Sequence, residues 1–251
     1  MKTVLITGAT SGIGEACAYK FAENNYRLIL TGRRGELLTT LCQRLTENYH
    51  VATYPLVFDV QDLQATQAAI QSLPQEWQDI DVLINNAGLA LGLEPQFEGD
   101  SDDWNTMIDT NIKGLLHVTR CVVPHMVERN SGHIINIGSV AGDAAYANGS
   151  VYCATKAAVK TLTDGLRIDV VDKNIRVTNI KPGLVETNFS NTRFHGDTAR
   201  AEKVYQGITP LTGADIADVA YYAASAPAHV QIAEVLVLAT HQANGSTIFR
   251  S

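Results

Sequence analysis

The sequence predicts an α/β protein, in which one domain is built on a doubly wound parallel sheet with helices on both faces. Two observations predict this fold. Short runs of Val, Ile and Leu without polar alternation are typical of strands buried on both faces of a parallel sheet. Longer amphipathic stretches separate these runs, and strand–helix alternation of this kind indicates right-handed βαβ crossovers.

Seven strands are expected in chain order, at Thr3–Thr7, Arg27–Thr31, Val51–Phe58, Val82–Asn85, Gly132–Gly138, Ile175–Lys181 and Val235–Ala239. Helical periodicity predicts helices over residues 13–25, 35–48, 62–78, 102–128, 152–173 and 214–226. The segment from Glu186 to Leu211 has no clear periodicity, which is typical of a binding loop or lid. We therefore expect one domain over residues 1–251 with a lid at about 186–211.

Composition excludes several classes of protein. Of the 251 residues, 45% are hydrophobic and 18% are charged, which excludes a disordered chain. The formal net charge of −7 disfavours a nucleic-acid partner. The four cysteines form no C-x-x-C pair, so we expect reduced thiols and no metal site. No apolar run approaches the ~18 residues of a membrane span, and we expect a cytoplasmic protein with no membrane partner.

A glycine-rich loop follows the first predicted strand. It reads Thr7-Gly8-Ala9-Thr10-Ser11-Gly12-Ile13-Gly14 and leads into a predicted helix. Glycines allow a sharp turn and a close backbone approach to a pyrophosphate, and the helix N-terminus adds partial positive charge. A glycine-rich turn without a ligand is the alternative, and the position at the first βα junction favours a dinucleotide site.

The end of the second predicted strand indicates which dinucleotide binds. An NAD site places an acidic residue about 20 residues beyond the loop, where it binds the ribose 2′-hydroxyl. Here the segment reads Thr31-Gly32-Arg33-Arg34 and contains no acid. Two guanidinium groups can bind a 2′-phosphate, so the segment favours NADP. A solvated arginine pair is the alternative.

Tyr152 and Lys156 open a predicted helix at positions i and i+4, so they lie on one helix face. A free tyrosine has a pKa of about 10, and a nearby ammonium favours its ionised form. Other polar residues follow predicted strands at the carboxyl edge, where parallel sheets bind ligands. These are Ser139, Asn85-Asn86-Ala87-Gly88 and Lys181-Pro182-Gly183, and Asn111 interrupts a predicted helix.

Together these motifs resemble the short-chain dehydrogenase/reductase family. The matching features span residues 7 to 187 in order: the Gly8–Gly14 loop, Asp59-Val60, Asn85–Gly88, Asn111, Ser139, Tyr152-x-x-x-Lys156 and Pro182-Gly183. The resemblance implies a Rossmann-like fold and an enzyme that transfers hydride between NADP and a CH–OH group. It also implies a homotetramer.

The resemblance implies a role for each matching residue. Tyr152 is the general acid/base and Ser139 binds the substrate oxygen. Lys156 lowers the pKa of Tyr152 and holds the nicotinamide ribose, and Asn111 helps to hold a water of a proton relay. The implied cofactor-binding residues are Gly8, Thr10, Ser11, Gly12, Ile13, Gly14, Arg33, Arg34, Asp59, Val60, Asn86, Ala87, Gly88, Tyr152, Lys156, Pro182, Gly183, Val185 and Thr187. Many NADP-dependent members carry a basic residue at the position of Ser11, so the prediction of NADP depends on Arg33 and Arg34.

A narrower resemblance concerns the substrate. Residues 85–92, 126–130, 132–139 and 189–194 resemble the NADP-dependent 3-hydroxy acid dehydrogenases. That group acts on serine, allo-threonine and related acids of the 3-hydroxypropionate/malonic semialdehyde type. We therefore expect a 3-hydroxy acid or 3-oxo acid substrate, with Arg193 of the aperiodic segment binding its carboxylate. The alternatives are a reductase of 3-oxoacyl thioesters or other ketones, and a non-catalytic NADP-sensing regulator.

Overall fold

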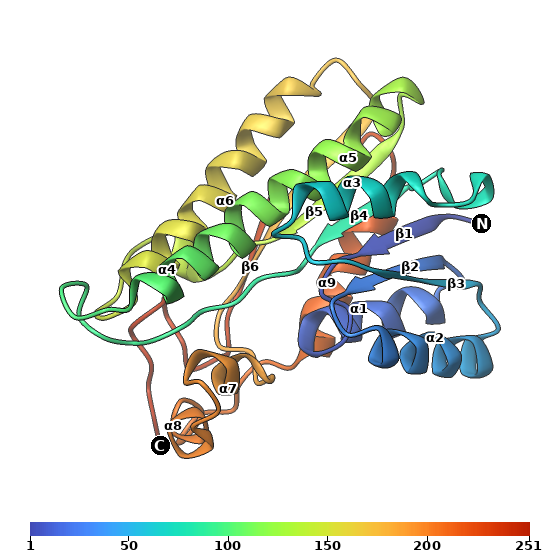
Figure 1. Ribbon diagram of the computed structural model, residues 1–251. Coiled ribbons are helices and arrows are strands. Elements are labelled where there is room, and N and C mark those ends of the chain that lie inside the picture. The colour runs from blue at the N-terminus through green and yellow to red at the C-terminus, as the bar shows by residue number, and fades with distance from the viewer.

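The computed structural model describes residues 1–251 and contains one seven-stranded parallel sheet in the order β3-β2-β1-β4-β5-β6-β7 (Figure 1). The strands are β1 (Thr3–Ile6), β2 (Arg27–Gly32), β3 (Thr53–Val57), β4 (Val82–Asn85), β5 (Gly132–Ile137), β6 (Ile175–Pro182) and β7 (Glu234–Val237). All seven predicted strands are present and all pairings are parallel. The predicted fold class is confirmed.

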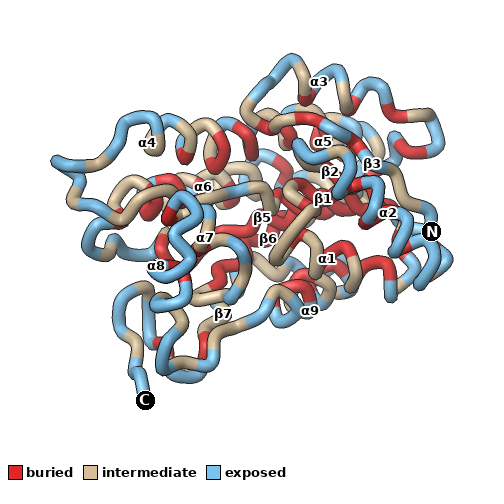
Figure 2. Tube along the Cα trace, turned by 60° about the horizontal axis from the view of Figure 1, so that its bottom comes forward, coloured by how far each residue is buried: buried red, intermediate tan, exposed pale blue.

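Helices cover both faces of the sheet (Figure 1). One face packs against α1 (Gly12–Glu23), α2 (Gly35–Tyr49) and α9 (Gly213–Ser225). The other packs against α3 (Leu63–Gln71), α5 (Leu115–Glu128) and α6 (Ser150–Asp169). Successive residues of β1 show why the strands lack polar alternation: Val4 and Ile6 enter the first apolar layer and Leu5 enters the second. Figure 2 shows the buried residues concentrated along the central strands and the inner faces of the helices.

Two predicted helices are interrupted. Residues 62–78 form α3 and then a short 3-10 helix, η1 (Gln75–Trp77), because Pro74 cannot continue a helical hydrogen-bond pattern. Residues 102–128 form α4 (Ser101–Ile108), a π-helical segment η2 (Asp109–Gly114) and α5. π-helical turns inside α-helices are frequent at functional sites, and this one contains Asn111.

The aperiodic segment from Glu186 to Leu211 contains two short helices, α7 (Phe189–Arg193) and α8 (Thr198–Lys203). Both are too short to show helical periodicity in the sequence. They lie away from the helices that cover the sheet and beside the C-terminal residues (Figure 1). Backbone hydrogen bonds confirm this proximity, since the amide of Ser251 donates to the carbonyl of Gly207.

The strand order reverses direction between β1 and β4, which are hydrogen-bonded neighbours in the sheet. Connections from the two strands run to opposite sides of this point, so a crevice opens beyond their carboxyl ends. The glycine loop follows β1 and the Asn86–Gly88 segment follows β4, which places both predicted motifs at this crevice.

Candidate active site

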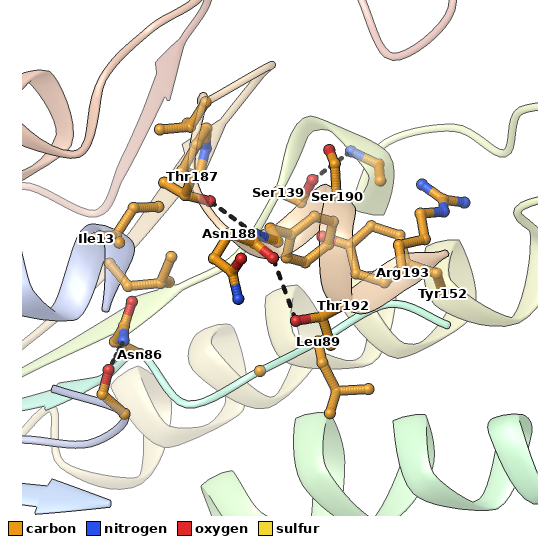
Figure 3. A pocket seen from close by; sticks show the side chains of 18 of the residues that line it. Ile13, Asn86, Leu89, Ser139, Tyr152, Thr187, Asn188, Ser190, Thr192 and Arg193 are labelled. Carbon is orange, nitrogen blue, oxygen red and sulfur yellow. Dashed lines mark hydrogen bonds between the residues drawn. The ribbon is translucent and has the colours of Figure 1, made fainter. Parts of the chain in front are cut away.

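A cavity of about 650 Å³ runs along the carboxyl edge of the sheet. Arg33 and Arg34 line one part of it, and Ser139, Tyr152 and Lys156 line another. Figure 3 shows Ile13 and Asn86 on one side of the pocket and Ser139, Tyr152 and Arg193 grouped on the other. Every predicted cofactor-binding residue lines the cavity except Gly14.

The glycine loop is shaped by two residues with positive φ, Gly8 at 64° and Gly12 at 58°. Gly14 has a different role from the predicted one. A Cβ at Gly14 would collide with the carbonyl oxygen of Gly8 and the amide of Asn86, so Gly14 packs beneath the loop and does not face the cavity. The Asn86 amide supports this arrangement, because its Nδ2 donates to the carbonyls of Thr7 at 2.9 Å and Gly8 at 3.1 Å.

Arg33 and Arg34 are exposed at the cavity rim, each with a partner that holds it there. Nη2 of Arg34 donates to Oγ1 of Thr10 over 2.7 Å. Nη1 of Arg33 lies 3.6 Å from Oδ2 of Asp59. The guanidinium of Arg34 therefore contacts the glycine loop, and that of Arg33 contacts the segment after β3. Their binding of a 2′-phosphate stays a prediction.

Ser139 and Tyr152 come from neighbouring elements. Ser139 is the N-cap of a 3-10 helix, η3 (Val140–Gly142), and its Oγ accepts from the amide of Ala141 at 3.1 Å. Tyr152 lies in the first turn of α6 and is 9% exposed. Burial raises the pKa of the Tyr152 phenol, and the nearby Tyr146 acts in the same direction, whereas Ser139 and Arg193 oppose the shift.

Lys156 lies near Tyr152, and its ammonium is held by a main-chain oxygen. Nζ of Lys156 is 6.0 Å from the centre of the Tyr152 ring and donates to the carbonyl of Ile137 at 2.9 Å. Burial of the Tyr152 phenol outweighs the groups that lower its pKa, and Lys156 is not among the groups that shift it. The lowering of this pKa by Lys156 stays a prediction. Burial also lowers the pKa of Lys156 itself to about 8.

Asn111 lies behind the cavity and does not line it. Its Nδ2 donates to the carbonyl of Leu89 at 2.8 Å and to Oγ1 of Thr155 at 3.0 Å, while its Oδ1 accepts from the amide of Leu89 at 2.9 Å. The side chain therefore ties η2 to the segment after β4 and to α6. The predicted role of Asn111 in holding a water of a proton relay stays a prediction.

Arg193 of α7 reaches the cavity next to Tyr152 (Figure 3). Its guanidinium carbon lies 5.8 Å from the centre of the Tyr152 ring and 5.5 Å from that of Tyr146. Nε donates to the carbonyl of Gly92 at 3.0 Å and Nη1 donates to the hydroxyl of Tyr146 at 3.0 Å. Arg193 thus adds a positive charge beside Tyr152. Its predicted contact with a substrate carboxylate stays a prediction.

Several cavity residues carried no signal in the sequence. They come from the loop before α6, from the segment after α8 and from the C-terminal segment: Tyr146, Tyr205, Gln242, Ile248 and Arg250. No motif marks these positions. Arg250 approaches the cavity because it donates to the carbonyls of Val204 and Gln206, which brings the chain end back over the segment that follows α8.

The arrangement fits a dinucleotide. Gly12 faces the side chain of Thr187 across the crevice. A Cβ at position 12 would lie 3.2 Å from that side chain, so the absence of a side chain at Gly12 keeps the crevice open. The cavity continues from the arginine pair to a buried tyrosine and lysine that can exchange a proton with a ligand. Fold and site together define a nucleotide-dependent oxidoreductase of the doubly wound class.

Comparison with known proteins agrees with this assignment. The family model described as short chain dehydrogenase matches residues 2–198. The NADP-dependent 3-hydroxy acid dehydrogenase YdfG of Salmonella typhi is 50% identical over 250 residues, covering 99% of each chain. The NADP-dependent 3-hydroxy acid dehydrogenase of Schizosaccharomyces pombe is 45% identical over 99% of this chain and 96% of its own.

A solved structure agrees as well. The closed form of a serine dehydrogenase complexed with NADP+ has a TM-score of 0.92 and 46% identity, with 99% of each chain covered. The chain belongs to the short-chain dehydrogenase/reductase family, as the sequence motifs predicted. No helix in the structure has the length and apolar character needed to cross a lipid bilayer.

Proposed function

We propose that this chain is an NADP-dependent dehydrogenase of 3-hydroxy acids that works reversibly on the corresponding 3-oxo acids. The observation that carries the proposal is the grouping of Ser139, Tyr152 and Arg193 on one wall of the cavity whose rim bears Arg33 and Arg34. A hydroxyl held by the first two residues and a carboxylate held by Arg193 describe a hydroxy acid. The names of the relatives support the same substrate class.

In this mechanism the chain handles the proton. The phenol oxygen of Tyr152 exchanges a proton with the substrate hydroxyl, and the hydroxyl of Ser139 donates a hydrogen bond to the same oxygen and shares its developing charge. When bound, the oxidised cofactor supplies the hydride acceptor and a positive charge near Tyr152. Such a charge favours deprotonation of Tyr152 and opposes the burial that raises the pKa of the phenol.

The remaining residues of the cavity bind and orient the cofactor. We assign Lys156 to the nicotinamide ribose, Arg33 and Arg34 to the 2′-phosphate, and Asp59 and Val60 to the adenine. We assign the stretch that includes Pro182, Gly183, Val185 and Thr187, all of which line the cavity, to the nicotinamide end. We assign Asn111 a supporting role, because its amide already holds Leu89 and Thr155.

We also propose that residues 186–211 act as a lid over the substrate. Three contacts join this segment to the chain after β4 and to α4: the backbone pair between Gly92 and Arg193, the Arg193 side chain on the Gly92 carbonyl, and His195 Nε2 at 3.0 Å from Oδ2 of Asp103.

A homotetramer and a cytoplasmic location remain part of the proposal. Exposed apolar side chains support association, since Ile168 is 73% and Val171 81% exposed. Light scattering would measure the assembly.

A substrate panel tests the proposal. It contains serine, allo-threonine, 3-hydroxypropionate, uncharged alcohols, ketones and a 3-oxoacyl thioester, each measured with NAD and with NADP. Higher kcat/KM with NADP and with the 3-hydroxy acids supports the proposal. A preference for thioesters or neutral ketones would replace it with the reductase alternative. Binding of NADP without turnover of any compound would favour the regulator.

A further inference from the structure

Lys181 is a buried charged residue outside the cavity. Its side chain is 7% exposed, yet its ammonium contacts two carboxylates from different elements. Nζ lies 2.9 Å from both oxygens of Asp143 and 2.6 Å from Oε1 of Glu234. Burial alone would lower the pKa of Lys181, but the hydrogen bonds to Glu234 and Asp143 outweigh burial and raise it, so the ammonium stays charged.

Asp143 connects this cluster to the active site. It is the C-cap of η3, the three-residue helix whose N-cap is Ser139. The other side of this turn rests on α6, because a Cβ at Gly142 would lie 2.7 Å from the carbonyl oxygen of Lys156. With so short a turn, the position of Asp143 and the contact with α6 together determine where the Ser139 hydroxyl lies relative to Tyr152.

Glu234 anchors the cluster of Lys181, Asp143 and Glu234 to the sheet. It pairs with Asn179 in the register between β6 and β7, while Lys181 pairs with Leu236 two residues further along. Lys181 is itself part of β6 and immediately precedes Pro182 and Gly183, which line the cavity. The ammonium therefore links the sheet edge to the turn that carries Ser139. Buried ion pairs contribute little net stability, but removal of one partner leaves the other charges unpaired and disturbs a defined geometry.

We propose that Lys181 is a positioning residue that orients Ser139 for catalysis through its ion pair with Asp143. The proposal rests on the function assigned to Ser139 above. It needs only that Ser139 contributes to turnover, and it does not depend on which hydroxy acid is the substrate. Neither Lys181 nor Asp143 lines the cavity, so an effect on Ser139 passes through the η3 turn, whereas an effect through Pro182 and Gly183 would not depend on Ser139.

A double-mutant cycle tests this role. Lys181→Met and Ser139→Ala are made singly and together, and each variant is assayed on a compound of the substrate panel that the wild type turns over. Lys181→Met keeps the side-chain volume and removes the charge. We expect it to lower kcat by about tenfold or more, because small displacements of a catalytic group have effects of that size. KM for NADP should stay unchanged. In the Ser139→Ala background the same change should cost less than about twofold, because the group that Lys181 positions is already absent.

Equal losses of kcat in both backgrounds would overturn the proposal and make Lys181 a purely structural residue. No effect of Ser139→Ala on its own would instead contradict the proposed function. Lys173→Met is the matched control, since Lys173 pairs with Asp172 on the surface, and it should leave kcat unchanged. If Lys181→Met does not fold, Asp143→Asn replaces it in the cycle. This nearly isosteric change removes the carboxylate at the η3 end of the pair. It should lower kcat in the wild-type background and have little effect in the Ser139→Ala background, and equal losses would again overturn the proposal.

Discussion

The ammonium of Lys156 donates a hydrogen bond to the main-chain oxygen of Ile137, 2.9 Å away on the strand that leads into Ser139. This bond ties the helix that carries Tyr152 to the strand that precedes Ser139. It spans 19 residues of sequence and lies in a buried environment. Tyr152 and Ser139, which we propose to contact the reacting oxygen, are thus tied together through this buried bond.

The pKa of Lys156 predicts how stability depends on pH. Burial lowers this pKa from 10.5 to about 8, so the folded chain binds the proton less tightly than the unfolded chain. The free energy of unfolding should therefore rise between about pH 8 and 10.5, by about 3 kcal/mol at most. Lys156→Met should lack this rise in urea unfolding of the cofactor-free protein. A variant with the wild-type pH dependence would mean that Lys156 is fully solvated.

A second pH effect comes from His133, buried in β5. Its Nε2 lies 2.8 Å from Oγ1 of Thr178, which itself donates to the carbonyl of Ile232, so Nε2 carries the proton and Nδ1 has no partner. Burial lowers the pKa of His133 to about 3, and nearby Arg176 acts in the same direction.

Because the unfolded chain protonates His133 first, the free energy of unfolding should fall as the pH drops below 6.5, by up to about 5 kcal/mol near pH 3. Denaturant titrations at a series of pH values should show a smaller fall for His133→Leu. Identical slopes for variant and wild type would assign the acid sensitivity to carboxylates.

Tyr152→Phe should abolish turnover and leave the affinity for NADP nearly unchanged. Phenylalanine keeps the ring, which packs at 5.7 Å from the ring of Phe189, and removes only the exchangeable proton. Steady-state assays would measure the loss, and fluorescence titration with NADPH would serve as the control for an intact cleft. Activity within about tenfold of wild type would contradict the role of Tyr152, since general acid–base catalysis contributes at least about a hundredfold.

The arginine pair should determine cofactor choice. Replacing both Arg33 and Arg34 with alanine should raise the Kd for NADP by about tenfold or more and change the Kd for NAD little, because NAD lacks the 2′-phosphate that we propose the pair binds. Arg44→Ala is the control, since Arg44 lies on the exposed face of α2 and outside the cavity. An unchanged ratio of the two dissociation constants would leave the pair without a role in binding.

Arg193 should distinguish charged from neutral substrates. Arg193→Met should lower kcat/KM for a 3-hydroxy acid by about tenfold or more and affect an uncharged alcohol little, because only the acid loses a charge-assisted bond. Arg200→Met provides the comparison, as Arg200 lies in the same segment and pairs with Glu94 on the surface at 3.8 Å. Equal losses on both substrates would give Arg193 a general role in closing the lid.

Local patterns in the sequence were enough to predict much of this protein. The strands, the glycine loop at the first βα junction and the i, i+4 pair of Tyr152 and Lys156 depend on residues close together in the chain. Helix and strand periodicity is a local property, so these features can be predicted without knowledge of the neighbours. The parallel order of the strands then brings their carboxyl ends to one edge.

Other properties of the site depend on tertiary structure: which residues line the cavity, and the direction in which the pKa of Tyr152 is shifted. Asn111 forms hydrogen bonds with Leu89 and Thr155 and does not line the cavity. Gly14 packs beneath the glycine loop. The pKa of Tyr152 is raised because long-range packing removes water from its phenol, a cost that its position in the sequence does not reveal. Contacts such as Lys181 with Asp143 join residues 38 apart. Desolvation and distance arise from tertiary packing, which local patterns do not encode.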